Sequence, residues 1–295
     1  MKRVLLAYNP NAGNGVIKSL LDDIIERFAE EDMLVVPYRI GGAFEIGRIF
    51  EELNPDEYQK IIAAGGDGTV NLVVNEMIKK DVTIPLAIFP TGTANDLAST
   101  LGIPQTIEGM ISTALSEDYI QTDVGKAGNR YFINVLAIGM LVDVSQRTDP
   151  LIKNTLGLGA YYLRSLAEIP FARASRIKIT CEGRTLDEKM SAVLVMNGRT
   201  AGGFKGVSPL SEVGDGLLDV LVVRKLILPT MLPALISVLT GHHTKDKRFE
   251  YFRTDRLRIE STEGKTIYSD VDGEKGDPLP LDIEIMPGRL LVNAK

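Results

Sequence analysis

One stretch limits what this chain can fold into more than any other: residues 63–71, which read AAGGDGTVN. It follows the apolar pair Ile61 and Ile62 and precedes residues 72–78, where apolar side chains recur at helical spacing. We therefore expect a turn between a strand and a helix. Glycines let a backbone approach a ligand closely because no Cβ intervenes, and the free N–H groups at a helix N-terminus suit phosphate.

Asp67 is the unusual residue of this stretch, because a bare carboxylate would repel a phosphate. A cation is therefore expected between them, and Mg2+ is the ion that most often joins carboxylates to nucleotide phosphates. The residues predict a nucleotide-phosphate site with a metal-handling aspartate. The alternative is a plain glycine turn, in which Asp67 would have no evident role.

Two further glycine loops follow predicted strands. Residues 9–15, NPNAGNG, follow the strand 4–8, and residues 90–98, PTGTANDLA, follow the strand 84–89. The first loop is neither a Walker A loop nor a dinucleotide-binding fingerprint. Loops that follow the strands of a parallel sheet share its carboxyl edge, where such sheets bind ligands. The three loops are therefore expected to line one site.

The first 125 residues alternate between apolar strands and amphipathic helices. The expected elements are, in order, 4–8, 17–28, 33–39, 44–53, 60–64, 69–80, 84–89 and a helix from Pro104 to Leu115. This order predicts an α/β domain with a parallel sheet covered by helices on both faces.

From residue 119 onward, strands outnumber helices and turns are frequent. The expected strands are 120–125, 130–140, 175–182, 190–197, 217–223, 256–261, 266–270 and 281–286, and the expected helices are 159–168 and 229–239. This pattern predicts a mainly antiparallel second domain. We place the domains at residues 1–125 and 126–295 and expect the active site in a cleft between them.

Composition excludes several classes of protein. The 295 residues carry a net charge of −6, which argues against a nucleic-acid binder with a broad basic face. We expect no signal peptide at the N-terminus, where the apolar run is short, and no stretch reaches the roughly 20 apolar residues of a membrane-spanning helix. The one cysteine, Cys181, favours a reducing compartment. We expect a cytoplasmic protein that meets any lipid substrate transiently, at the inner face of the membrane.

Several acidic residues near glycine turns are candidates for chemistry. Asp67 and Asp96 lie on the expected ligand edge of one sheet, where carboxylates could hold Mg2+. Residues 270–274, DVDGE, could supply a general base, although a charged hairpin tip is the favoured interpretation of this pattern alone. Residues 212–217, EVGDGL, are rich in oxygen ligands for a hard cation but lack EF-hand spacing.

Four motifs together resemble the diacylglycerol kinase catalytic-domain family, and within it the soluble bacterial lipid kinases. They are NPNAG at 9–13, GGDGTVN at 65–71, PTGTAND at 90–96 and DGE at 272–274. The resemblance spans nearly the whole chain. GGDGT alone is shared with NAD kinases and, more loosely, with phosphofructokinases, so the opening NPNAG and the late DGE are what favour a lipid kinase.

The resemblance implies an ATP- and Mg2+-dependent lipid kinase that phosphorylates the hydroxyl of diacylglycerol or a related lipid, giving phosphatidic acid or its analogue. Asp67, Asp96 and Asp123 would form a water-linked acidic network around the catalytic Mg2+, and Glu274 would take the proton from the lipid hydroxyl. The ATP site would be lined by Asn9, Pro10, Asn11, Ala12, Gly13, Gly65, Gly66, Asp67, Gly68, Thr69, Val70, Asn71 and Thr93.

The resemblance also implies a second, structural Mg2+ held by Asp215 and by backbone oxygens of Glu212 and Leu217. The second domain would be β-sandwich-like and would form the lipid-facing side of the cleft, with its last segment, 288–292, returning to the first domain. Two departures stand out: residues 39–42 read RIGG where many members carry Ser or Thr, and Ala12 replaces a common serine.

Two other functions stay open at this point. One is a kinase of a soluble nucleotide such as NAD, which would be saturated by NAD without lipid or detergent. The other is a nucleotide- or lipid-binding module that has lost turnover, which would bind ATP without transferring phosphate. The sequence does not name the lipid acceptor, and an exposed strand edge could pair two copies into a homodimer.

Overall fold

The computed structural model describes residues 2–41, 45–140, 174–201 and 204–294. The chain divides into two compact units, one formed by Met1–Val124 with Pro287–Lys295 and the other by Gly125–Met286. Strands β5 (Tyr119–Ala127) and β17 (Leu281–Asn293) have residues in both units. The helix expected at 159–168 lies outside the described residues.

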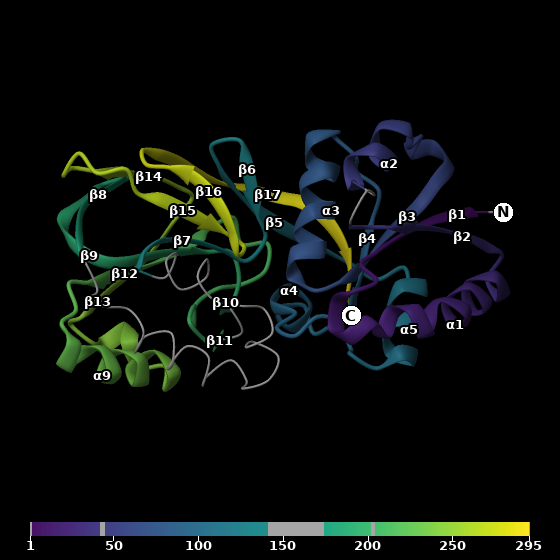
Figure 1. Cartoon of the computed structure of the whole chain (residues 1–295), viewed down its shortest axis with the longest axis horizontal. Coiled ribbons are helices and arrows are strands. Elements are labelled where there is room, and N and C mark those ends of the chain that lie inside the picture. The colour runs from purple at the N-terminus through teal and green to yellow at the C-terminus, as the bar shows by residue number, and fades with distance from the viewer. Residues whose placement is uncertain (1, 42–44, 141–173, 202–203, 295) are drawn as a thin grey trace. The chain divides into compact units, whose positions relative to one another are not determined.

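The first unit has a parallel sheet with helices on both faces, as the sequence predicts. Strands pair in the order β2–β1–β3–β4, all parallel, and the end of β17 adds beside β4, also parallel. Figure 1 shows α2 and α3 on one side of these strands and α1 and α5 on the other. The elements are β1 (Lys2–Tyr8), η1 (Ala12–Gly15), α1 (Val16–Glu30), β2 (Met33–Arg39), α2 (Ile46–Glu52), η2 (Pro55–Glu57), β3 (Tyr58–Gly65), α3 (Asp67–Lys79), β4 (Leu86–Pro90), α4 (Asp96–Thr100) and α5 (Ile107–Leu115).

Burial explains why the three central strands of this unit read as unbroken apolar runs. Residues 4–7, 61–64 and 86–89 are all buried, as expected for parallel strands that are covered on both faces. On α1 the buried side chains are Ile17, Leu20, Ile24 and Phe28, at helical spacing. They meet apolar side chains of the strands and of α5 in one core cluster, which fixes the carboxyl edge of the sheet.

The second unit is antiparallel and β-sandwich-like, and this prediction is also confirmed. Its strands pair as β13–β12–β9, β9–β7–β15–β16 and β9–β8–β14–β17, with every pair antiparallel. The elements are β6 (Arg130–Phe132), β7 (Val135–Gly139), β8 (Ser175–Cys181), β9 (Arg184–Met196), β10 (Thr200–Ala201), β11 (Phe204–Lys205), β12 (Leu218–Arg224), α9 (Leu228–Leu239), η3 (His243–Lys245), β13 (Phe249–Thr254), β14 (Arg256–Ser261), β15 (Tyr268–Val271) and β16 (Glu274–Pro278).

Sequence patterns missed four strands, β10, β11, β13 and β16, and the first six residues of β9. Residues 184–189 and 274–278 are mostly exposed or half-exposed polar side chains, so they carry no apolar alternation. Backbone hydrogen bonds to neighbouring strands, and not burial, hold them in the sheet. The resulting β15–β16 hairpin carries Glu274.

The starts of α3 and α5 also differ from expectation. α3 begins at Asp67 and not at Thr69, so the carboxylate belongs to the first turn of the helix. α5 begins at Ile107 and not at Pro104, because the Thr106 hydroxyl caps it by accepting the Gly109 N–H at 3.2 Å. The first difference places Asp67 at the positive end of a helix dipole, where an anion is favoured.

Candidate active site

The three glycine loops of the first unit meet at the carboxyl edge of its sheet. Gly13 has φ +53°, and a Cβ on it would lie 1.8 Å from the carbonyl oxygen of Thr91. Asn9 donates its backbone N–H to Ala64 at 2.9 Å, and its side-chain amide donates to Thr69 Oγ1 at 3.4 Å. The loop after β1 is therefore packed against the loops after both β3 and β4.

Gly66 and Gly92 bring the other two loops into backbone contact. A Cβ on Gly92 would lie 2.3 Å from the Cα of Gly66. Next to this contact, the Thr91 N–H donates to the carbonyl of Gly65 at 3.0 Å. Any side chain at Gly92 would push the two loops apart, so glycine is required here for the approach of one backbone to another.

Asp67 links the starts of two helices. Its Oδ1 accepts the backbone N–H of Asp96, the first residue of α4, at 2.7 Å. Burial raises the pKa of the Asp67 carboxyl, and hydrogen bonds from the N–H groups of Asp96, Asn95 and Leu97 offset only part of that rise. Burial thus makes the ionised carboxylate of Asp67 less favourable than it is in water. A neighbouring cation would stabilise this ionised form.

Asn95 builds the loop that presents the Asp96 N–H, and the sequence patterns did not single it out. It is buried, with φ +52°, a backbone conformation that Asn adopts more readily than most residues. Its side chain accepts the Gly92 N–H at 3.0 Å and donates to the carbonyls of Gly92 and Pro90 at 3.0 and 3.3 Å. A signal was available, since Asn follows a glycine turn and precedes a helix.

The other predicted acidic residues are buried in the same unit. Asp96 is 4% exposed, and Asp123 on β5 is 1% exposed and accepts the Gly288 N–H at 2.6 Å. Within the described part of the chain, no three His, Cys, Asp or Glu side chains stand close enough to hold one metal ion. Mg2+ commonly keeps several waters and binds one or two carboxylates plus phosphates, so Asp67 and Asp96 fit a water-linked ion.

The remaining predicted nucleotide contacts lie on these same loops. Thr69, Val70 and Asn71 are buried in the first turns of α3, whereas Gly68 and Thr93 are exposed. Pro10 is buried and Asn11 is exposed; Ala12 and Gly13 are half-buried at the start of η1. At the exposed positions, Asn11, Gly68 and Thr93, this edge of the sheet is open to a ligand.

Glu274 lies in the second unit, in a turn that one carboxylate holds in place. Asp272 accepts three backbone N–H groups, from Ile133 at 2.7 Å, Asn134 at 3.0 Å and Val135 at 2.8 Å. Its own N–H donates to the Val135 carbonyl at 2.9 Å. This network fixes the β15–β16 turn against the loop before β7.

The turn itself has little conformational freedom. Asp272 and Gly273 have φ +49° and +89°, and Asp270 accepts the Gly273 N–H at 2.8 Å. Glu274 then projects from the first residue of β16 with its side chain about half exposed, 3.9 Å from Arg130. A carboxylate on a fixed turn and open to solvent can reach an acceptor hydroxyl and take its proton.

The loop predicted to hold a second Mg2+ is arranged around Asp215. This carboxylate accepts the N–H groups of Glu212 at 3.1 Å and Leu217 at 2.9 Å. It also pairs with the guanidinium of Arg253, whose Nε lies 3.5 Å from the buried Asp219. The positive charge of Arg253 already neutralises the carboxylate, so a metal ion would compete with it; the second site stays a prediction.

Both halves of the chain match families of known proteins. The family model described as the diacylglycerol kinase catalytic domain matches residues 3–127, and the model described as the YegS C-terminal NAD kinase beta sandwich-like domain matches residues 134–294. A diacylglycerol kinase of Bacillus subtilis strain 168 is 30% identical over 281 residues, covering 95% of this chain and 92% of the relative. The chain belongs to the diacylglycerol kinase family.

Other members agree with this assignment. A diacylglycerol kinase of Staphylococcus epidermidis strain ATCC 12228 is 31% identical over 283 residues, covering 95% of this chain and 88% of the relative. The crystal structure of a diacylglycerol kinase from Bacillus anthracis strain Sterne covers the whole chain with a TM-score of 0.79, 28% sequence identity and 97% of its own chain. The protein is therefore an enzyme, a lipid kinase, and the resemblance seen in the sequence is confirmed.

A lipid kinase must reach a substrate that resides in membranes. Across the described residues, every helix is too short or too polar to cross a bilayer.

Proposed function

We propose that this kinase transfers the γ-phosphoryl group of ATP to the hydroxyl of diacylglycerol, with Mg2+, giving phosphatidic acid and ADP. The observation that carries the proposal is the position of Asp67. A half-buried carboxylate at the start of α3, joined at 2.7 Å to the start of α4, lies among three packed glycine loops. Phosphoryl transfer depends on positioning and charge stabilisation, and this edge of the sheet offers both.

The glycine loops would hold the triphosphate through their backbones. The starts of α3 and α4 present N–H groups and the positive ends of helix dipoles. The packed contacts between Gly13 and Thr91 and between Gly66 and Gly92 keep these N–H groups in place before ATP binds. The loops then lose their conformational entropy when the protein folds, and not when ATP binds.

Asp67 and Asp96 are the carboxylates that would hold Mg2+, directly or through water. The ion would neutralise charge that develops on the transferred phosphoryl group. The raised pKa of Asp67 agrees with this role, because a site that penalises a bare carboxylate gains most from a cation. Asn95 would act indirectly, by fixing the loop from which the Asp96 N–H reaches Asp67.

Glu274 would be the general base. Its carboxylate takes the proton of the lipid hydroxyl while that oxygen bonds to the γ-phosphorus and the bond to the β–γ bridging oxygen breaks, releasing ADP. Asp272 would act indirectly, by positioning the turn from which Glu274 projects.

The experiment is an incubation with γ-labelled ATP, Mg2+ and mixed micelles of diacylglycerol, with ceramide, monoacylglycerol and NAD in parallel. We expect label in phosphatidic acid, and a fall in kcat of about a hundred- to ten-thousandfold for Glu274→Gln. The matched control is Glu284→Gln, because Glu284 and Glu274 side chains are both 53% exposed and each faces one cation. The control should keep wild-type turnover.

The other outcomes separate the alternatives. Label that moves only into NAD would overturn the lipid acceptor and leave the nucleotide site in place. ATP binding without label in any acceptor would favour a module that has lost turnover. Equal losses in Glu274→Gln and Glu284→Gln would remove the specific role of Glu274 as the base.

A further inference from the structure

Helix α9 exposes a stripe of large apolar side chains. Leu232, Ile236 and Leu239 are 55%, 51% and 53% exposed, and their spacing of four and three residues puts them on one face of the helix. Ile227, directly before the helix, is 56% exposed. By contrast, the exposed Val16 and Ile25 of α1 are nine positions apart, on opposite faces. The stripe is thus a patch and not a scatter of single residues.

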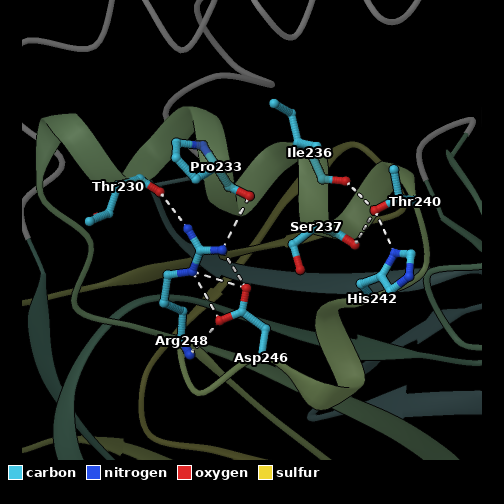
Figure 2. A network of polar contacts seen from close by, with 8 residues as sticks. All are labelled: Thr230, Pro233, Ile236, Ser237, Thr240, His242, Asp246 and Arg248. Atoms are coloured by element: carbon cyan, nitrogen blue, oxygen red, sulfur yellow. Dashed lines mark hydrogen bonds and ion pairs between the residues drawn. The ribbon is translucent and has the colours of Figure 1, made fainter.

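The opposite face of α9 is firmly attached to the second unit. Met231 and Ala234 are buried in a core cluster with side chains of β9, β12 and β13. Arg248 donates to the carbonyls of Thr230 and Pro233, both at 3.3 Å, which Figure 2 shows beneath the helix. The exposed stripe therefore belongs to an anchored helix.

The charges around the stripe are positive. Asp246 is engaged by Arg248, with Nε 3.0 Å from each carboxylate oxygen (Figure 2), which holds the pKa of that carboxyl far below its usual range. Lys245 and Lys247, on either side of Asp246, are exposed, as is Lys225 two residues before Ile227.

No acidic group of the described chain balances these lysines. None of Lys225, Lys245 and Lys247 forms an ion pair with a described acidic side chain. Glu250, on the neighbouring strand β13, is engaged by Arg184 and Arg224 at 3.0 and 2.9 Å. A chain of net charge −6 thus presents an apolar stripe with a cationic edge at this place.

We propose that α9, with Lys225, Lys245 and Lys247, is the surface by which the enzyme docks on an anionic phospholipid bilayer. The inference rests on the proposed lipid-kinase function, for which a membrane contact is needed. An amphipathic helix of this kind lies in the interface with its apolar face among the acyl chains, while lysines meet anionic headgroups. A second copy of this chain fits less well, because a two-fold contact through α9 would set the same lysines against each other.

The test measures co-sedimentation with vesicles of phosphatidylglycerol and phosphatidylcholine. Ile236→Ser should weaken binding about tenfold, the loss expected when one large aliphatic side chain no longer enters the acyl region. The matched control is Ile25→Ser, since Ile25 is also a helical isoleucine and is 42% exposed. It should bind vesicles within about twofold of wild type, which corresponds to a difference of about 0.4 kcal/mol in binding free energy. Leu239→Ser serves as a second stripe variant, and circular dichroism checks that each variant is folded.

A second arm tests the cationic edge. The double variant Lys245→Gln, Lys247→Gln should bind the anionic vesicles about tenfold or more weakly and lose most of its salt dependence. Lys79→Gln, Lys80→Gln is the control pair, because both lysines are exposed at the end of α3 in the other unit. Wild-type binding to pure phosphatidylcholine vesicles should resemble that of the double variant on anionic vesicles.

Turnover separates docking from chemistry. Ile236→Ser should phosphorylate monomeric dioctanoylglycerol at the wild-type rate but lose activity on dioleoylglycerol in vesicles. Wild-type vesicle binding by both stripe variants would overturn the docking surface and leave the kinase function intact. A wild-type dimer that Ile236→Ser converts to a monomer, with vesicle binding unchanged, would overturn it too. A third outcome is possible: wild type binds vesicles, Ile236→Ser does not, and neither protein phosphorylates diacylglycerol. That result would support the docking surface and contradict the proposed function.

Discussion

The Asp67 carboxylate accepts the backbone N–H of Asp96 at 2.7 Å and so ties the first turn of α3 to the first turn of α4. These two helices follow neighbouring parallel strands, β3 and β4. The bond places a charge-bearing side chain where phosphate groups and a metal ion are expected, and burial makes that charge costly in the free protein. Function and stability therefore make opposite demands on Asp67.

Asp67→Asn should separate these demands. The amide oxygen can still accept the Asp96 N–H, but the side chain no longer ionises, so kcat should fall about a hundred- to a thousandfold. Because the pKa of Asp67 is raised in the folded protein, wild-type unfolding free energy falls as pH rises through that raised value. The variant should lack this fall and be at least as stable as wild type at neutral pH.

The measurement is thermal unfolding with and without Mg2+ and ATP, alongside turnover. The two ligands together should raise the unfolding temperature of wild type more than that of Asp67→Asn. A variant that keeps turnover within about tenfold of wild type, a loss of only 1.4 kcal/mol, would contradict the role of Asp67.

Asp272→Asn should weaken both the fold of the second unit and catalysis. The carboxylate accepts three backbone N–H groups, and a neutral amide offers weaker bonds and only one acceptor atom. We expect a loss of about 1–3 kcal/mol in unfolding free energy and a lower kcat with KM for ATP unchanged.

Asp277→Asn is the matched control for Asp272, because Asp277 is an exposed aspartate on the same hairpin. It should leave both stability and kcat near wild type. A purely structural role for Asp272 would lower stability without changing kcat of the folded fraction, and that result would remove its link to Glu274.

The fold could be predicted from sequence wherever burial leaves a pattern. Apolar runs such as 61–64 marked the central strands, and the buried residues at helical spacing in 17–28 marked α1. Strand β16 could not be found in this way, because EKGDP has only one buried position. Its place is set by backbone pairing with β15, a long-range relationship that no local pattern encodes.

Some residues of the candidate site could also be predicted, because they lie in a local sequence pattern. Glycine loops after strands can be recognised from the sequence, and they named Asp67 and Asp96. The roles of Asn95 and Asp272 depend on hydrogen bonds to backbone atoms brought together by folding, such as the bond from Ile133 to Asp272 across 139 positions of the chain. The pairing of Arg253 with Asp215 was equally invisible, since Arg253 lies in a strand that the patterns missed.

Arg253→Gln should raise the affinity of the Asp215 loop for Mg2+. The guanidinium competes with any cation for this carboxylate, so its removal should tighten binding about tenfold, the effect of roughly 1.4 kcal/mol. Titration calorimetry in the Asp67→Asn background isolates this loop from the catalytic ion. Asp215→Asn should abolish the signal, and weaker Mg2+ binding in Arg253→Gln than in its parent would show that Arg253 helps to build the site.

Lys60 offers a test that is independent of catalysis. Its side chain lies in the first unit, 4% exposed, and donates to the carbonyls of Ala114 and Ser116. Burial lowers the pKa of this ammonium group from 10.5 to about 8, although the charge of Glu117 acts in the opposite direction. The folded protein therefore releases this proton more readily than the unfolded chain does.

The sign of the effect follows from linkage. Between about pH 8 and pH 10.5 the unfolded chain holds more protons at this position than the folded protein, so unfolding free energy should rise with pH across that window. Lys60→Met removes the titrating group, and its stability relative to wild type should decline over the same window. Lys80→Met, at an exposed lysine, is the control and should keep a constant difference from wild type. Denaturant unfolding at a series of pH values measures these differences, and parallel curves for wild type and Lys60→Met would show that Lys60 titrates alike in both states.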